Sequence, residues 1–285
     1  MTSHAGHHDH HHQLDWSVRG QELVTAGEVV APMVDQALGW LVERVPAATA
    51  VLDVGSGPGV AACTFARMLP RARVVAADGA PPLLEMARQR ATQLGLDDRL
   101  DTRQVSLPDG LADLPPADLI WVSGVVHHLP DPVAALRALG ALLRPGGLLA
   151  VREGGLESRF LPGGVAPGLL GRLEAISEDL VASADHPAGI VAHHGGWPDL
   201  LRAAGLRPAG SRSFLLDLPA PVSPEVRQYL HGRLGMMRSF TADHVSPADD
   251  AAMSTLLDED SPDGLLRRTD LFLLSATTVH TAATP

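Results

Sequence analysis

Four residues, Asp53, Gly55, Gly57 and Gly59, have types and a spacing that suit the binding of a polar ligand. Glycine has no side chain, so a glycine-rich backbone can turn tightly and approach a ligand closely. A helix that follows such a turn presents its free N–H groups and the positive end of its dipole to whatever lies there. The pattern predicts a nucleoside cofactor held at the edge of a parallel sheet.

Apolar runs around these residues predict the elements that position them. Residues 51–54 form the short run of a strand covered on both faces, with Asp53 near its carboxyl end. A second run, 73–77, ends at Asp78, where a doubly wound fold places an acid on ribose hydroxyls. Further predicted elements are strands over 100–105, 117–124 and 148–153, and a helix over 133–143 that stops at the Arg-Pro-Gly-Gly sequence of residues 144–147.

The spacing of the glycines separates two kinds of nucleoside cofactor. A dinucleotide fingerprint has glycine at its first, third and sixth places, but here Gly59 is at the fifth place and Val60 at the sixth. This departure disfavours a nicotinamide-dependent dehydrogenase. The order of an acid and three alternating glycines instead resembles the first motif of the class I S-adenosylmethionine (SAM) methyltransferases. Segments 125–132 and 144–147 resemble later motifs of that family, so the resemblance covers roughly residues 48–155.

The resemblance implies a fold, an activity and a cofactor. The fold is expected to be an α/β, Rossmann-like class I methyltransferase fold: a seven-stranded, mostly parallel sheet flanked by helices, with helical lid insertions. The expected activity transfers a methyl group from SAM to oxygen, nitrogen or carbon of a small-molecule acceptor in secondary metabolism, leaving S-adenosylhomocysteine (SAH). Two other functions stay open. One is cyclisation or decarboxylation on the same fold, and the other is metal or partner binding by the histidine-rich N-terminal residues.

By the same resemblance, Gly55 and Gly57 border the amino acid part of SAM, and Asp53 orders the site by hydrogen bonds. Asp78 takes the ribose hydroxyls. Ser106 stands where the family often has an acid for the adenine amino group, which implies a weaker adenine contact. The residues expected at the cofactor are Asp53, Gly55, Ser56, Gly57, Gly59, Asp78, Gly79, Ser106, Leu107 and Ser123.

The adjacent histidines His127 and His128 follow the fourth predicted strand. An imidazole titrates in the range that a general base needs, and the resemblance favours His128 for removing a proton from an acceptor hydroxyl or amine. The alternative is that both histidines only cap and pack the following loop. The residues expected on the acceptor side are His127, Arg152, Glu153, His193, His194 and Trp197. For Arg152 and Glu153, a buried ion pair is the alternative.

Patterning along the chain also predicts its organisation. The expected segments are a disordered tail (1–13), lid helices (14–46), a SAM-binding core (47–153) and the remainder of the sheet (154–285), with acceptor-side helical insertions at about 154–195 and 219–268. Pro32 is expected to begin a second helix within 14–46. No metal is assigned, but the tail contains possible metal ligands: His4, His7, His8, His10, His11 and His12.

Composition limits the partners. The net charge is −11 with histidines neutral, which argues against a surface that follows nucleic-acid phosphates. No apolar run approaches the ~20 residues needed to cross a bilayer, so we expect a cytoplasmic protein without a membrane span. The single cysteine, Cys63, cannot form an internal disulfide and is expected to pack in the core. A homodimer stays open.

Overall fold

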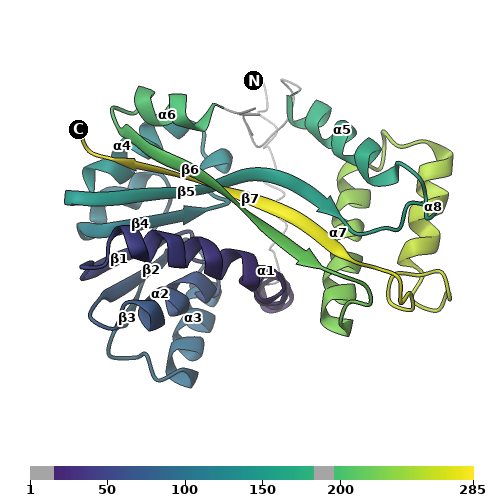
Figure 1. Ribbon diagram of the computed structural model, residues 1–285, viewed down its shortest axis with the longest axis horizontal. Helices are drawn as coiled ribbons and strands as arrows, with labels where there is room; N and C mark the ends of the chain where they lie inside the picture. The colour runs from purple at the N-terminus through teal and green to yellow at the C-terminus, as the bar shows by residue number, and fades with distance from the viewer. Residues whose placement is uncertain (1–15, 183–195) are drawn as a thin grey trace, which may run out of the picture.

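The computed structural model describes residues 16–182 and 196–285, and its organising feature is one seven-stranded sheet (Figure 1). The strand order is β3-β2-β1-β4-β5-β7-β6. β7 runs antiparallel to its neighbours β5 and β6, whereas every other pair is parallel. The strands are β1 (Ala50–Val54), β2 (Arg73–Asp78), β3 (Leu100–Gln104), β4 (Ala117–Ser123), β5 (Leu143–Arg159), β6 (Arg207–Leu218) and β7 (Leu273–Ala283). The predicted fold, a mostly parallel seven-stranded sheet with flanking helices, is confirmed.

Helices cover both faces of this sheet and bury its apolar side chains. The longer helices are α1 (Trp16–Arg44), α2 (Val60–Met68), α3 (Pro81–Gln93), α4 (Pro132–Ala141), α5 (Leu169–Ala182), α6 (Trp197–Ala203), α7 (Pro224–Thr241) and α8 (Pro247–Leu257), and the short ones are η1 (Asp109–Asp113) and η2 (Val126–His128). One core cluster joins the sheet to α1 and α2, and the other joins its opposite face to α4 and α6. No helix within the described ranges is long and apolar enough to span a membrane.

Three helices begin where the sequence supplies a side-chain cap. Asp131 accepts a hydrogen bond from the Ala134 N–H at 2.9 Å before α4, and Ser223 and Ser246 cap α7 and α8 in the same way. Such caps satisfy N–H groups that have no partner within the helix. A proline follows each cap at the first helical position, where its missing N–H costs nothing.

α1 is one continuous helix through Pro32, so the prediction of two helices in this region is wrong. Proline removes one hydrogen bond from a helix interior. The loss is offset because Met33, Ala37, Leu38 and Leu41 bury an apolar stripe in the core that α1 shares with α2 and the sheet. Tertiary packing therefore overrides the local signal of the proline.

β5 is longer than the predicted strand at both ends. It begins at Leu143, because residues 143–147 belong to the strand around a register shift against β4, so the predicted strand start at residue 148 is wrong. The preceding helix does end before residues 144–147, as predicted. β5 also continues past Glu153 to Arg159, because β7 supplies an antiparallel partner as far as Leu274. The strand therefore occupies the first residues of the insertion predicted over 154–195.

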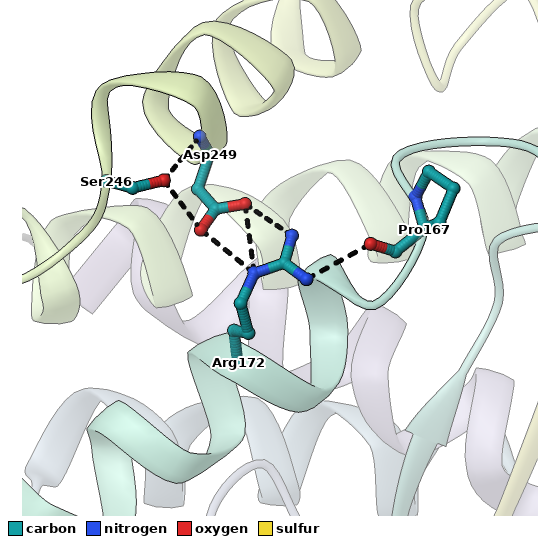
Figure 2. Close-up of polar contacts among 4 residues, drawn as sticks. All are labelled: Pro167, Arg172, Ser246 and Asp249. Carbon is teal, nitrogen blue, oxygen red and sulfur yellow. Dashed lines mark hydrogen bonds and ion pairs between the residues drawn. The ribbon is translucent and has the colours of Figure 1, made fainter.

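Helices α5, α7 and α8, called the cap below, pack together at the far end of the long strands β5, β6 and β7 (Figure 1). Figure 2 shows one tie within the cap, where Arg172 of α5 holds the carboxylate of Asp249 at the start of α8. The Arg172 Nε and Nη2 atoms donate to the two Asp249 oxygens at 3.0 and 2.6 Å. Ser246 donates to the same carboxylate at 2.9 Å, and Pro167 accepts from Arg172 Nη1 at 3.1 Å. A second ion pair, Arg238 with Asp250, joins α7 to α8.

Candidate functional site

The turn after β1 lies against the end of β2. The N–H groups of Gly55 and Ser56 both donate to the Ala77 carbonyl, at 2.8 and 3.0 Å. Gly59 then begins α2 with φ +75°, and a Cβ there would lie 2.7 Å from the Ala87 Cβ of α3. The position therefore excludes any side chain on two grounds, the left-handed backbone and the contact with α3.

Asp78, the last residue of β2, is fixed by backbone donors. Its Oδ2 accepts from the Gly57 N–H and its Oδ1 from the Ala80 N–H, both at 2.9 Å. These bonds join the end of β2 to the glycine turn. A carboxylate oxygen can accept more than one hydrogen bond, so Asp78 keeps acceptor capacity for a ligand hydroxyl.

Asp53 is buried in β1 with only 2% of its surface exposed, and its Oδ2 has no hydrogen-bond partner among the residues that the structure describes. Burial raises the pKa of Asp53 to about 7, the Ala62 backbone hydrogen bond opposes the rise, and the charge of Asp78 adds to it. A buried acceptor without a partner is uncommon in a protein interior. Together with the open space beside Gly57, where a Cβ would meet nothing within 4 Å, it fits a polar nucleoside ligand at this turn.

The predicted cofactor residues all lie at one edge of the sheet. Each is at the carboxyl end of a parallel strand from β1 to β4 or in the segment directly after it, the edge at which open α/β sheets bind ligands. They comprise Asp53, Gly55, Ser56, Gly57 and Gly59 at β1, Asp78 and Gly79 at β2, Ser106 and Leu107 after β3, and Ser123 at β4.

Glu153, from β5 at the same edge, organises the loop after β4. Its side chain is 6% exposed. Its Oε1 accepts from the N–H groups of Val125 and Val126 at 3.0 and 3.1 Å, and its Oε2 lies 2.8 Å from His127 Nδ1. The sequence predicted Glu153 and His127 as separate site residues. The structure joins them in one partly buried hydrogen bond.

This contact distinguishes the two adjacent histidines. Glu153 orients the His127 ring, and an Nδ1–H that donates to the carboxylate leaves Nε2 as the basic nitrogen. His128 is exposed and has no such carboxylate partner. Partial burial and the neighbouring His127 ring, whose centroid is 3.8 Å away, lower the pKa of His128. His127 is thus held by a carboxylate, whereas His128, the predicted general base, is not.

Arg152 and Glu153 do not form the ion pair that the sequence left open. Adjacent residues of a strand point to opposite faces of the sheet, and Arg152 Nη1 instead donates to the Ser123 Oγ at 2.9 Å. Burial lowers the pKa of Arg152. The Arg152 Nε atom is buried and has no hydrogen-bond partner in the described part of the chain.

The remaining predicted candidates are packed in the core or lie outside the described residues. Trp197 is 5% exposed and packs in the core beside α4, where its ring stacks on His280, so the structure places it among core residues. Burial raises the pKa of the Cys63 thiol to about 11, as expected for a packed cysteine. His193, His194 and the six tail histidines lie outside the described residues. Within residues 16–182 and 196–285, no group of three potential ligands could hold a metal ion.

Two adjoining clefts run along α7 and share Arg233 and Met236. The smaller, about 360 Å³, lies between α7 and residues 21–26 of α1 and includes Tyr229. The larger, about 590 Å³, lies between α7, α5 and the end of β5. Sequence reasoning missed these residues of α7. The apolar pattern predicts a helix there, but it does not show which side chains face α1.

Comparison with known proteins adds independent findings. Residues 52–149 match the family model described as a methyltransferase domain. Over 116 residues the chain is 40% identical to a ubiquinone biosynthesis O-methyltransferase of Xylella fastidiosa, a match that covers 40% of this chain and 46% of that enzyme. The chain spans less than half of the length of the curated relatives it matches.

Solved structures with a similar fold include an O-methyltransferase family protein from Burkholderia thailandensis and the cyclase SpnF. The first has a TM-score of 0.52 and 21% identity over 68% of this chain and 56% of that one. The second has a TM-score of 0.51 and 18% identity over 93% of this chain and 97% of that one. Identities this low establish the fold alone.

The sheet order, the glycine turn and the acids at the ends of β1 and β2 define a class I methyltransferase fold. The match of residues 52–149 to the methyltransferase-domain model agrees with the class that the sequence motifs predicted.

Proposed function

We propose that the protein is a SAM-dependent methyltransferase that acts on a small-molecule acceptor. The proposal rests on one observation: two sets of residues lie at the same edge of the sheet. One is the glycine turn with Asp53 and Asp78, and the other is the His127–Glu153 pair. The first group supports cofactor binding, and the second supports proton removal from an acceptor.

In this proposal the turn and its acids hold SAM. Asp78 accepts hydrogen bonds from the ribose hydroxyls with the capacity that its backbone partners leave. The orphaned Asp53 oxygen accepts from a polar group of the cofactor or from a water that it orders. Ser106 and Leu107, after β3, lie at the adenine end and contribute hydroxyl and backbone contacts in place of an acid.

When bound, SAM supplies an activated methyl group that is transferred in line to the acceptor atom. An acceptor hydroxyl or amine must lose a proton as its new bond to carbon forms. His127 Nε2 takes that proton, while Glu153 holds Nδ1 and stabilises the imidazolium that results. A carbon acceptor is also compatible with the site.

The acceptor binds, in this proposal, in the cleft of about 360 Å³ between α1 and α7. The first half of α1 is close to the cofactor turn, since a Cβ on Gly27 would lie 3.1 Å from Val60, the first residue of α2. The cap helix α7 forms the opposite wall. The net charge of −11 supports an acceptor that is not a nucleic acid. The expected cytoplasmic location and role in secondary metabolism stay part of the proposal. A homodimer is compatible with the fold.

The alternative with the same fold is cyclisation or decarboxylation. The likeness to SpnF concerns the fold alone, so product mass must decide. We would incubate the protein with SAM and a panel of hydroxylated and amine-bearing small molecules, and measure SAH formation together with acceptor mass. Methyl transfer predicts stoichiometric SAH and a gain of ~14 Da per transfer. Conversion of an acceptor without SAH would replace the proposal with the alternative.

A further inference from the structure

Arg152 is a cation at the candidate site that makes no hydrogen bond to a carboxylate within the described ranges, although the charge of the neighbouring Glu153 acts on it. It ends the stretch of β5 that pairs in parallel with β4, directly opposite Ser123. Its Nη1 donates to Ser123, its Nε is buried without a partner, and its Nη2 makes no hydrogen bond within the described ranges. The edge of the guanidinium formed by Nε and Nη2 is therefore unused.

Other arginines of this chain show what that edge does when a carboxylate is present. Arg172 donates from Nε and Nη2 to Asp249 (Figure 2), and Arg268 does the same to Asp270. This fork geometry matches the two oxygens of a carboxylate. Arg152 presents the same donors with no protein acceptor opposite them.

The surroundings of Arg152 point to a ligand as the missing acceptor. A buried charge is costly to leave unpaired, and proteins retain one mainly where a partner compensates it. Arg152 lies on the face of the sheet covered by α1 and α7, and both Glu153 and the Tyr229 phenol of α7 are close enough to act on it electrostatically without bonding its Nε/Nη2 edge. Tyr229 also lines the cleft proposed for the acceptor.

We propose that the Nε and Nη2 atoms of Arg152 bind the carboxylate group of a ligand at this site. The inference rests on the proposed function and adds to it a residue that recognises one chemical group of the ligand. The carboxylate has two possible sources at this edge, the methionine part of the cofactor and the acceptor. In either case Arg152 selects for the carboxylate over a neutral group of the same shape.

Isothermal titration calorimetry with the full chain and an Arg152→Met variant separates these sources. The first arm uses SAH and the analogue of SAH that lacks the carboxylate. The second arm uses benzoate and trans-cinnamate, each beside its carboxamide, added to protein with and without saturating SAH. Arg268→Met is the matched control, because it removes the same fork from a site distant in the chain. Thermal unfolding confirms that each variant is folded, and Arg152→Lys, which keeps the charge without the fork, replaces Arg152→Met if that variant does not fold.

We expect Arg152→Met to lose about 10- to 100-fold in affinity for a carboxylate ligand and little for its neutral counterpart. Loss confined to SAH assigns the carboxylate to the cofactor, whereas loss confined to the benzoate or trans-cinnamate probes assigns it to the acceptor. Equal binding of every ligand by wild type and variant, including equal failure to bind the probes, would overturn the inference. Failure of the wild type to bind SAH would count against the proposed function instead, and the carboxylate probes alone would then decide the role of Arg152.

Discussion

Asp53 in the sheet and Asp249 in the cap are both buried carboxylates, with 2% and 6% of their surfaces exposed, but their partners differ. Arg172 and Ser246 satisfy Asp249, and the hydrogen bonds from Arg172 hold the pKa of Asp249 below its usual value. Asp53 has an oxygen without a partner, and burial raises its pKa to about 7. The aspartate in the cap therefore has its hydrogen-bond acceptors occupied by protein groups, whereas the aspartate in the sheet keeps one oxygen available to a ligand.

Two arginines repeat this contrast. Arg172 in the cap donates from Nε and Nη2 to the Asp249 carboxylate. The Nε and Nη2 atoms of Arg152 at the candidate site donate to no group among the described residues. Buried polar groups usually have partners, so the two exceptions at the sheet edge, Asp53 Oδ2 and Arg152 Nε, support a ligand there. In the cap, the Nε atom of Arg233 in α7 is a further exception. The comparison predicts that variants at the sheet edge change binding and catalysis, while variants in the cap change stability.

The largest expected effect is on turnover through His127. Replacing His127 by Ala removes the oriented base, so the rate of SAH formation with an acceptor hydroxyl should fall about 10²–10⁴-fold. The affinity for SAH, measured by calorimetry, should change little. His128→Ala is the matched control, with a small expected effect. A larger loss of rate in His128→Ala than in His127→Ala would restore His128 as the base.

The glycine turn provides the next largest effect. Gly59→Ala adds backbone strain at φ +75° to a clash with Ala87, so it should cost about 2–5 kcal/mol of the free energy of unfolding. Gly57→Ala has a similar backbone strain, with φ +53°, but open space around its Cβ, and should cost only about 1–2 kcal/mol. Urea denaturation followed by circular dichroism measures both. Equal losses would mean that contact with α3 does not limit this turn.

Asp53 should make stability fall as pH rises. Its pKa is raised on folding, from 3.8 to about 7, so the folded state binds more protons between these values and loses that advantage as Asp53 ionises. The loss is at most on the order of 4 kcal/mol, since each pKa unit corresponds to about 1.4 kcal/mol. Asp53→Asn cannot ionise, so its stability relative to the wild type should rise between about pH 4 and pH 7. If the free energies of unfolding of the two proteins changed with pH in parallel, Asp53 would not be desolvated in solution.

The cap pair should show the opposite pH dependence and a smaller effect. Because the pKa of Asp249 is lowered on folding, its contribution is present above the unfolded value of 3.8 and disappears as pH falls through the folded value. Arg172→Met should therefore lower Tm by a few degrees at neutral pH and by less in acid, with SAH affinity unchanged. Arg202→Met, which breaks an exposed pair with Asp199, is the control and should leave Tm nearly unchanged. Reduced SAH affinity in Arg172→Met would break the separation between the two regions.

The sequence predicted the cofactor edge because that site depends on local order. Asp53 and the glycines lie within seven consecutive residues, and Asp78 ends the next strand, so the turn chemistry and the strand pattern suffice to place them. The sheet order follows from the family motifs.

Contacts between distant residues decided what the sequence did not predict. The Glu153 contact with His127 joins residues 26 apart, and it is the reason that we propose His127 as the base in place of the predicted His128. Arg172 and Asp249 are 77 residues apart, and no spacing rule connects them. The single helix through Pro32 and the long β5 likewise depend on packing partners that lie elsewhere in the chain.

The most direct test of cofactor binding is calorimetric titration of the purified protein with SAH, beside an Asp78→Ala variant shown to be folded by circular dichroism. We expect micromolar binding by the wild type and its loss in the variant. Asp78 holds the Gly57 N–H and, in the proposed function, also accepts hydrogen bonds from the ligand. Absence of SAH and SAM binding by folded wild-type protein would contradict the account.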